Sequence, residues 1–347
     1  MKALVLEQNG RLKYNDVPMP QMAEDECLLA VKAAGVCSSD ILRAFANGAY
    51  FYPLIMGHEF SGEIIECGPK VSNFVPGQQV AVFPLLPCFE CPACLEKRWV
   101  HCRSYSYYGS RRHGAFCEYI SVKSWNLIPI PEGCDVELAS LCEPLAVCVH
   151  TLNAIPNDCE GTLAIIGAGF MGLCLAKVAQ RSGQFSQIWL LDRNQFKLDI
   201  ARDWGFSTIL LNSDRQSKLF SGQRFNVVIE ACGAVETYRL STAICAHSGQ
   251  VIWMGNIAGD FSLTQKQVSS ILRREISIHG VWNSEFQPGE LCEWTDSLDL
   301  IAHDSWIRDL VSHRVSLAEG KAILEDLCSI KKEHRPHSYL KVCFRFK

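Results

Sequence analysis

Four cysteines stand close together in the run Cys88-Phe-Glu-Cys91-Pro-Ala-Cys94, which is followed after seven residues by Cys102. Thiolates at this spacing can hold a zinc ion tetrahedrally and leave no coordination position open. An iron–sulfur cluster and a nucleic-acid-binding zinc ribbon are the alternatives. The fourth cysteine lies farther along the chain than in bacterial ferredoxins, and the flanking basic residues are few. The spacing therefore predicts a structural zinc site formed by these four thiolates.

A second set of metal-ligand types lies outside that run: Cys37 in GVCSSD, His58 and Glu59 in GHEFSGEI, and Glu143 in CEPLAV. A single cysteine is usually a core residue and a single glutamate is usually solvated. A catalytic zinc takes three ligands of these types and keeps one position open. Asp40 is spaced to accept a hydrogen bond from His58 and to fix its tautomer. Together with the coenzyme motif described next, these residues suggest a catalytic zinc.

A glycine motif of Gly167, Gly169 and Gly172 follows the apolar run TLAIIG and precedes a helical pattern. Alone, such a motif also fits a tightly packed turn. Between a strand and a helix, it lets the backbone and the helix N-terminus approach a pyrophosphate. Asp192 ends the next apolar run, where a carboxylate accepts ribose hydroxyls and repels a 2′-phosphate. The motif predicts a nicotinamide coenzyme, NAD rather than NADP, although Arg193 weakens that preference.

The elements that must position these residues change in type along the chain. Up to about residue 130, short apolar segments alternate with turn residues, as in ECLLAVKAAG and GQQVAVFP, which is typical of antiparallel strands. A helical pattern follows from about residue 136. The runs TLAIIG, QIWLLD, STILLN, FNVVIE and GQVIWMG then alternate with helical stretches. Strands alternating with helices predict an α/β fold with a doubly wound parallel sheet.

The composition excludes several classes of function. A net charge of -4 without basic blocks offers no surface for nucleic acid or an anionic membrane. The N-terminal MKALVLEQNG lacks the apolar core of a secretory signal. Eighteen cysteines in an unsecreted chain indicate metal ligands and reduced thiols rather than disulfides. We expect a cytoplasmic protein that acts on a small molecule.

These motifs, in this order and spacing, resemble the zinc-containing medium-chain alcohol and polyol dehydrogenases over essentially the whole chain. Glu143 stands where alcohol dehydrogenases carry a cysteine ligand, which resembles the sugar-alcohol branch. Longer stretches are similar to the bacterial galactitol-1-phosphate 5-dehydrogenase subfamily, namely NGAYFYP, PLLPCFECPACL, GSRRHGAFCEYI and ILRREISIHGVWN.

The resemblance implies a Rossmann coenzyme domain over residues 149–285. It also implies a mostly β, GroES-like catalytic domain over residues 1–148 and 286–347. Each subunit of a homodimer or homotetramer would hold NAD and two zinc ions, one catalytic and one structural.

The resemblance also assigns roles to residues of the candidate catalytic site. Cys37, His58 and Glu143 would be zinc ligands, with Glu59 a ligand or a group beside them. Ser39 matches the hydroxyl that meets the substrate oxygen, and with Glu143 it would carry the proton. The histidine that relays this proton in many alcohol dehydrogenases is replaced by Leu42, so the proton path differs.

Six residues are candidates for substrate binding: Arg43, Tyr50, Arg111, Arg112, Trp282 and Asn283. Each also fits ordinary packing or a solvated surface. An arginine can hold a phosphate bidentately, but adjacent residues of an extended chain point in opposite directions. We therefore expect only one of Arg111 and Arg112 to reach a phosphate.

The favoured reaction is the oxidation of galactitol 1-phosphate to tagatose 6-phosphate. The alternatives are a neutral polyol such as sorbitol, an amino alcohol such as threonine, and a non-enzymatic scaffold that binds zinc and NAD.

Overall fold

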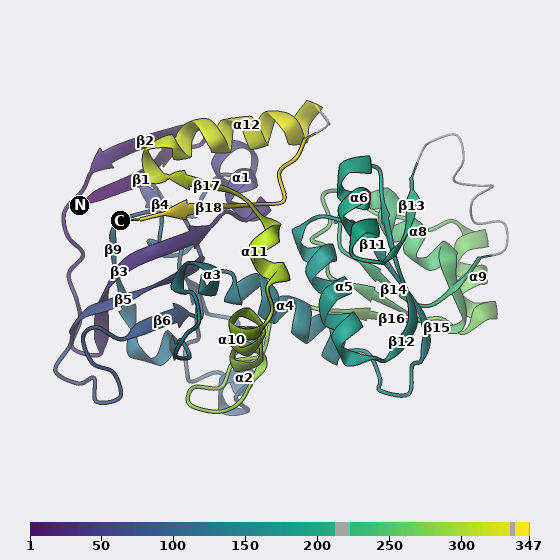
Figure 1. The fold of residues 1–347 in the computed structure, drawn as a ribbon, viewed down its shortest axis with the longest axis horizontal. Helices are drawn as coiled ribbons and strands as arrows, with labels where there is room; N and C mark the ends of the chain where they lie inside the picture. The colour runs from purple at the N-terminus through teal and green to yellow at the C-terminus, as the bar shows by residue number, and fades with distance from the viewer. Residues whose placement is uncertain (212–222, 334–336, 347) are drawn as a thin grey trace. The chain divides into compact units, whose positions relative to one another are not determined.

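The computed structural model describes residues 1–211, 223–333 and 337–346 and divides into two compact units (Figure 1). The first unit comprises Met1–Ala146 and Ser284–Lys347, and the second comprises Val147–Asn283. Within the described residues, no helix combines the length and the apolar character needed to cross a membrane.

The first unit is rich in antiparallel strands. One sheet has the order β2-β1-β4, a larger one has the order β10-β6-β5-β3-β18-β17 with β9 also paired to β3, and β7 pairs with β8. The strands are β1 (Lys2–Gln8), β2 (Arg11–Asp16), β3 (Glu26–Gly35), β4 (Leu54–Ile55), β5 (Glu59–Cys67), β6 (Gln79–Val82), β7 (Leu85–Leu86), β8 (Ser106–Tyr107), β9 (Tyr119–Lys123), β10 (Leu127–Pro129), β17 (Val311–Ser316) and β18 (Lys341–Arg345).

Helices of the first unit are mostly short. They are α1 (Ser38–Leu42), the π-helical turn η1 (Arg43–Asn47), α2 (Pro92–Leu95), η2 (Trp99–His101), η3 (Ser124–Asn126), α3 (Val136–Ala139), α10 (Glu293–His303), α11 (Trp306–Leu310), η4 (Leu317–Glu319) and α12 (Gly320–Glu333), together with the start of α4 (Cys142–Asn153). α12 lies along β1 and β2 (Figure 1) and contributes Leu324 to the main core, where Leu4 and Phe344 are also fully buried.

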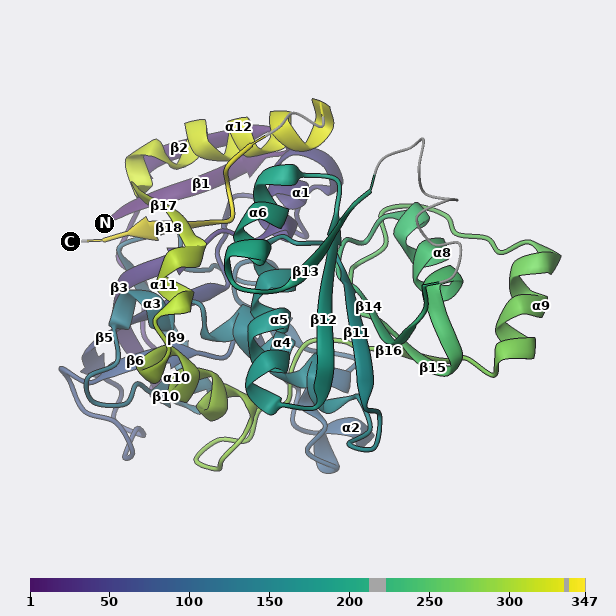
Figure 2. The same cartoon turned by 45° about the vertical axis from the view of Figure 1, so that its right-hand side comes forward.

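The second unit is a six-stranded parallel sheet in the order β13-β12-β11-β14-β15-β16. α5 and α6 cover one face of it, and α8 and α9 cover the other (Figure 2). The elements are β11 (Gly161–Ile166), α5 (Phe170–Ser182), β12 (Phe185–Asp192), α6 (Gln195–Asp203), β13 (Ser207–Leu210), β14 (Phe225–Glu230), α8 (Val235–Ile244), β15 (Cys245–Trp253), α9 (Gln265–Arg274) and β16 (Ser277–Gly280). This is the dinucleotide-binding strand order, with its topological switch between β11 and β14.

The predicted fold class is confirmed. Buried apolar runs form the parallel strands because helices cover both sheet faces: Leu163, Ile165 and Val228 are fully buried. The N-terminal segments form antiparallel strands, as their alternation indicates, and ECLLAVKAAG coincides with β3.

Candidate functional site

Three potential metal ligands converge where β3 and β5 lie side by side. Cys37 follows the end of β3 and caps α1, and His58 directly precedes Glu59, the first residue of β5. Gly35 pairs with Glu59 across the two strands, so the register brings the two segments together. The ligand atoms of Cys37, His58 and Glu59 all lie within 4.8 Å of one another. A thiolate, an imidazole and a carboxylate at this separation fit a zinc ion.

Asp40 contacts both Cys37 and His58 and orients them. Its carboxylate is fully buried, and Oδ2 accepts a hydrogen bond of 3.1 Å from the Cys37 backbone N–H. Oδ1 lies 3.4 Å from Nδ1 of His58. Desolvation lowers the pKa of His58, but Asp40 and Cys37 outweigh it, and the net pKa is well above its usual value. Asp40 thus stabilises positive charge at this position, whether it comes from a proton or from a cation that replaces the proton.

A buried ammonium group accompanies Glu59. Lys341, in β18, forms an ion pair with Glu59, and the two side chains are 5% and 2% exposed. Its Nζ also donates to the Val36 carbonyl at 3.2 Å. Burial lowers the pKa of Lys341, yet the Glu59 charge raises it overall. Gly35 makes room for this pair, because a Cβ there would overlap the Glu59 carboxylate.

Glu143 lies in the first turn of α4 and outside the group of three mutually close ligand atoms. Its Oε1 accepts a hydrogen bond of 3.2 Å from the Tyr107 hydroxyl, and the Tyr107 ring centroid lies 5.8 Å from that of His58. Desolvation, together with the charge of Glu59, raises the pKa of Glu143 to about 7. In addition to Asp40, the structure therefore offers two carboxylates near Cys37 and His58, Glu59 paired with Lys341 and Glu143 held by Tyr107.

Ser39 and Leu42 lie in α1, directly after Cys37. Both side chains are partly buried. Leu42 offers no group that could transfer a proton, whereas the hydroxyl of Ser39 can donate and accept hydrogen bonds.

The four-cysteine run folds into a compact lobe around α2 and η2. The Sγ atoms of Cys88, Cys91, Cys94 and Cys102 lie within 4.8 Å of one another. Hydrogen bonds, first among them one involving the Cys94 backbone, lower the pKa of Cys91 to about 6, whereas desolvation raises that of Cys94 to about 12. Four thiols gathered in this way fit a closed tetrahedral zinc site.

The glycine motif connects β11 to α5. Gly167 has a φ of +112°, and a Cβ at Gly172 would overlap the Gly167 carbonyl oxygen, so the helix packs directly on the loop. Gly169 is the N-cap of α5, and the nearest atom to a Cβ there would be Lys197 Nζ at 4.0 Å. The space above Gly169 and the helix N-terminus fits a pyrophosphate.

Asp192 ends β12 beside this loop. Its Oδ2 accepts the Ala168 N–H at 2.8 Å, and its Oδ1 accepts the Asn194 N–H at 2.8 Å. A carboxylate has about four acceptor positions, so it can still bind ribose hydroxyls. Arg193 follows it directly and is exposed.

The six candidates for substrate binding separate into groups. Arg111 lies between the rings of Tyr50 and Tyr105, at 4.4 and 4.2 Å from their centroids. Arg43 lies 5.9 Å from the Tyr50 centroid. Arg112 instead faces another part of the first unit. Trp282 and Asn283 belong to the second unit, whereas the ligand group belongs to the first, and Trp282 is 54% exposed.

Sequence reasoning gave no role to Tyr105, Tyr107 or Lys341. The two tyrosines stood in an aromatic run next to the arginine pair, which was the available signal. Lys341 gave no local signal, because only the pairing of β18 with β3 brings it to Glu59.

Two family models match the chain. The alcohol dehydrogenase GroES-like domain matches residues 23–132, and the zinc-binding dehydrogenase model matches residues 171–302. The first match covers Cys37, His58 and the four-cysteine lobe, and the second covers Asp192.

Among curated proteins, galactitol 1-phosphate 5-dehydrogenase of Escherichia coli (strain K12) is 32% identical over 335 residues, which are 94% of this chain and 96% of that protein. A crystal structure of galactitol-1-phosphate dehydrogenase from Escherichia coli superposes with a TM-score of 0.87 at 30% identity, with all of both chains covered. A structure from Sinorhizobium meliloti 1021 bound to NADP has a TM-score of 0.87 at 26% identity and covers 99% of each chain.

Proposed function

Because this chain belongs to the zinc-dependent medium-chain dehydrogenases, oxidoreductases that act on small molecules, we propose that it oxidises a secondary hydroxyl of a sugar-alcohol phosphate with NAD. The favoured reaction converts galactitol 1-phosphate to tagatose 6-phosphate. One observation carries this proposal: the close group of Cys37, His58 and Glu59, with Glu143 beside it, in a chain 32% identical to galactitol 1-phosphate 5-dehydrogenase.

Cys37, His58 and Glu143 would hold the catalytic zinc, with Glu59 as a further ligand or as the group behind them. A zinc ion in this position supplies a Lewis acid that makes a substrate hydroxyl easier to deprotonate. Asp40 keeps the His58 ring turned so that its other nitrogen is available. The ammonium of Lys341 balances the charge of Glu59, whereas Glu143 is held by the neutral hydroxyl of Tyr107, which supports Glu143 as the carboxylate for the metal.

The substrate proton passes to Ser39 and Glu143. Glu143 is buried and accepts a hydrogen bond from Tyr107, and a carboxylate held beside the substrate hydroxyl can accept and release a proton. Tyr107 donates to Glu143 Oε1, so this hydrogen bond does not involve Glu143 Oε2. Leu42 cannot transfer a proton. Glu143 would therefore replace the histidine that relays the proton in many alcohol dehydrogenases.

The second unit binds the coenzyme that accepts the hydride. Gly167, Gly169 and Gly172 would make room for the pyrophosphate, and Asp192 would bind the adenosine ribose. We propose a preference for NAD over NADP, because the Asp192 carboxylate would repel a 2′-phosphate. Arg193 would reduce this preference without reversing it.

We also propose a second zinc in the four-cysteine lobe, which gives two ions per subunit. The subunit would assemble as a homodimer or homotetramer. β16 supports this assembly, because it ends the parallel sheet and could pair along its outer edge with a second copy.

The experiment compares reduction of NAD by the zinc-loaded protein with galactitol 1-phosphate, galactitol, sorbitol and L-threonine. We expect the highest kcat/KM with galactitol 1-phosphate. Equal values for the phosphate and the free polyols would favour a neutral-polyol dehydrogenase, and a preference for threonine would favour an amino-alcohol dehydrogenase. No activity with any of a broad panel of alcohols would favour a non-enzymatic scaffold.

A further inference from the structure

The neighbouring arginines at positions 111 and 112 point to different surroundings. The turn that carries them is held by the Tyr107 carbonyl, which accepts the backbone N–H groups of Ser110, Arg111 and Arg112. Gly109, with a φ of +80°, allows the tight turn. From this turn the two guanidinium groups reach different partners, Tyr50 and Tyr105 for Arg111 and Tyr108 and Glu26 for Arg112.

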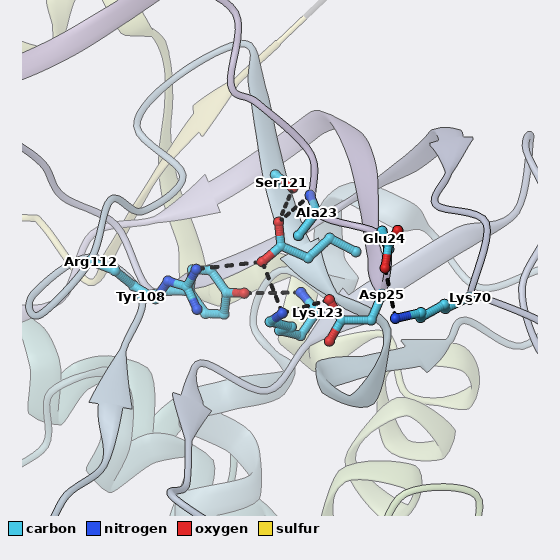
Figure 3. Close-up of polar contacts among 9 residues, drawn as sticks. Ala23, Glu24, Asp25, Lys70, Tyr108, Arg112, Ser121 and Lys123 are labelled. Carbon is cyan, nitrogen blue, oxygen red and sulfur yellow. Dashed lines mark hydrogen bonds and ion pairs between the residues drawn. The ribbon is translucent and has the colours of Figure 1, made fainter.

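Arg112 is part of an internal charge network (Figure 3). Its Nη2 lies 3.6 Å from Oε1 of Glu26, and its guanidinium carbon lies 4.7 Å from the centroid of the Tyr108 ring. Glu26 is only 5% exposed, and its Oε2 also accepts from the Ser121 hydroxyl at 2.7 Å. Lys123 lies 3.7 Å from the same carboxylate. The charge of Arg112 is thus already paired within the first unit.

Arg111 and Arg43 have no such pairing. Across residues 1–211, 223–333 and 337–346, neither guanidinium group has a carboxylate within ion-pair distance. The Nε of Arg43 is buried and lacks a hydrogen-bond partner among the same residues. A buried N–H without a partner is destabilising, more so when it is charged, and a bound anion would satisfy it.

Both guanidinium groups converge on one ring. Tyr50 lies 4.4 Å from the Arg111 guanidinium carbon and 5.9 Å from that of Arg43, and the ring is 65% exposed. Tyr105 packs on Arg111 from the other side at 4.2 Å. Ring stacking holds Arg111 rigid without using its N–H donors. Two cations beside one aromatic ring repel each other, and an anion between them would remove that repulsion.

A chain of aromatic contacts connects this pair to the metal ligands. Tyr105 contacts Tyr107 edge-on at 6.2 Å, and Tyr107 in turn contacts His58 and donates to Glu143. Arg43 lies one helical turn after Ser39. Arg43 and Arg111 are therefore connected to the ligand group through a short series of neighbouring side chains in the first unit.

We propose that Arg43 and Arg111, arranged by Tyr50 and Tyr105, form a subsite for a phosphate monoester, and this proposal rests on the proposed function. The two forks of N–H donors match the three terminal oxygens of a phosphate dianion better than the single charge of a carboxylate. The subsite fixes the phosphate end of the substrate while a hydroxyl farther along reaches Cys37 and His58. Arg43 and Arg111 would determine selectivity for phosphorylated substrates, whereas Arg112 would stabilise the fold.

The test measures kcat/KM for galactitol 1-phosphate and for galactitol with the zinc-loaded wild-type protein and the variants Arg111→Gln, Arg111→Lys and Arg43→Gln. Arg112→Gln is the matched control. We expect Arg111→Gln to reduce the ratio of the two kcat/KM values roughly 10- to 100-fold, which corresponds to losing charged hydrogen bonds. Arg111→Lys should recover part of this loss, and Arg112→Gln should keep the wild-type ratio with a lower melting temperature.

Binding of inorganic phosphate, measured by calorimetry, separates failure of this proposal from failure of the proposed function. If the wild-type protein prefers the phosphate ester and both Gln variants at 43 and 111 retain that preference, the subsite is wrong and the proposed function stands. If the wild-type protein shows no preference for the ester, the proposed substrate is wrong. In that case, phosphate binding that is lost in Arg111→Gln supports the subsite, and absence of binding overturns it.

Discussion

Replacement of Lys341 by methionine tests the buried ion pair behind the metal ligands. Methionine retains most of the length of the side chain but removes the ammonium group, which leaves the Glu59 carboxylate 2% exposed and without its cation. Breaking a buried ion pair by removing one partner typically costs about 3–5 kcal/mol, because the remaining charge stays desolvated. We expect the free energy of unfolding of the Lys341→Met variant to fall by about this amount.

Lys32→Met provides the control. Lys32 lies 3.7 Å from Glu63 on the same pair of strands, but these side chains are 29% and 35% exposed. Such a pair contributes about 0.2–1 kcal/mol, so the control should lose far less stability. The assay is urea unfolding of both variants under the same metal load.

A double variant distinguishes the ion pair from simple packing. With Glu59→Gln also present, Lys341→Met no longer leaves a buried charge, so its further cost should be at least about 1 kcal/mol smaller than in the wild-type background. If the two changes are additive, or if Lys341→Met costs no more than the control, the ion pair does not stabilise Glu59 and the reasoning is refuted.

Three further outcomes are expected. Gly172→Ala should abolish coenzyme binding, measured by NADH fluorescence titration, because the added methyl group would overlap a backbone oxygen of the coenzyme loop; unchanged affinity would contradict this packing. Burial lowers the pKa of His113, whose Nδ1 accepts a backbone N–H, so its stabilising effect is full above the unfolded pKa and is lost as pH falls through the folded value. Between about pH 7 and about pH 5, the melting temperature of His113→Asn should therefore fall less than that of the wild-type protein. Equal decreases in the two melting temperatures would contradict this. Cys94→Ser should reduce the zinc content from two ions to one per chain, as measured by elemental analysis. If both ions are retained, Cys94 is not a zinc ligand.

Features encoded in consecutive residues were predictable from the sequence. The parallel sheet and the coenzyme loop depend on local runs, since a buried strand, the glycines and Asp192 follow one another along the chain. The four-cysteine lobe is equally local. The short edge strand β16 gave no clear pattern, because Ser277–Gly280 has only one large apolar residue and is mostly exposed.

Features that depend on distant segments were not predictable. Lys341 lies next to Glu59 only because β18 pairs with β3. Nothing in the sequence around Lys341 indicates this pairing. The directions of Arg111 and Arg112 depend on the backbone at Gly109 and on the buried Glu26, which lies far away in the sequence. The sequence alone does not indicate which of the two neighbouring arginines, Arg111 or Arg112, forms an ion pair within the fold.

Isotope transfer tests the central claim most directly. Galactitol 1-phosphate carrying deuterium at C5 is oxidised by the zinc-loaded protein with NAD, and the reduced coenzyme is examined by mass spectrometry. Our account predicts that the deuterium appears on the nicotinamide ring, and that Cys37→Ser, which removes a proposed zinc ligand, abolishes the transfer. Oxidised substrate without deuterium in the coenzyme, or undiminished transfer by the variant, would contradict it.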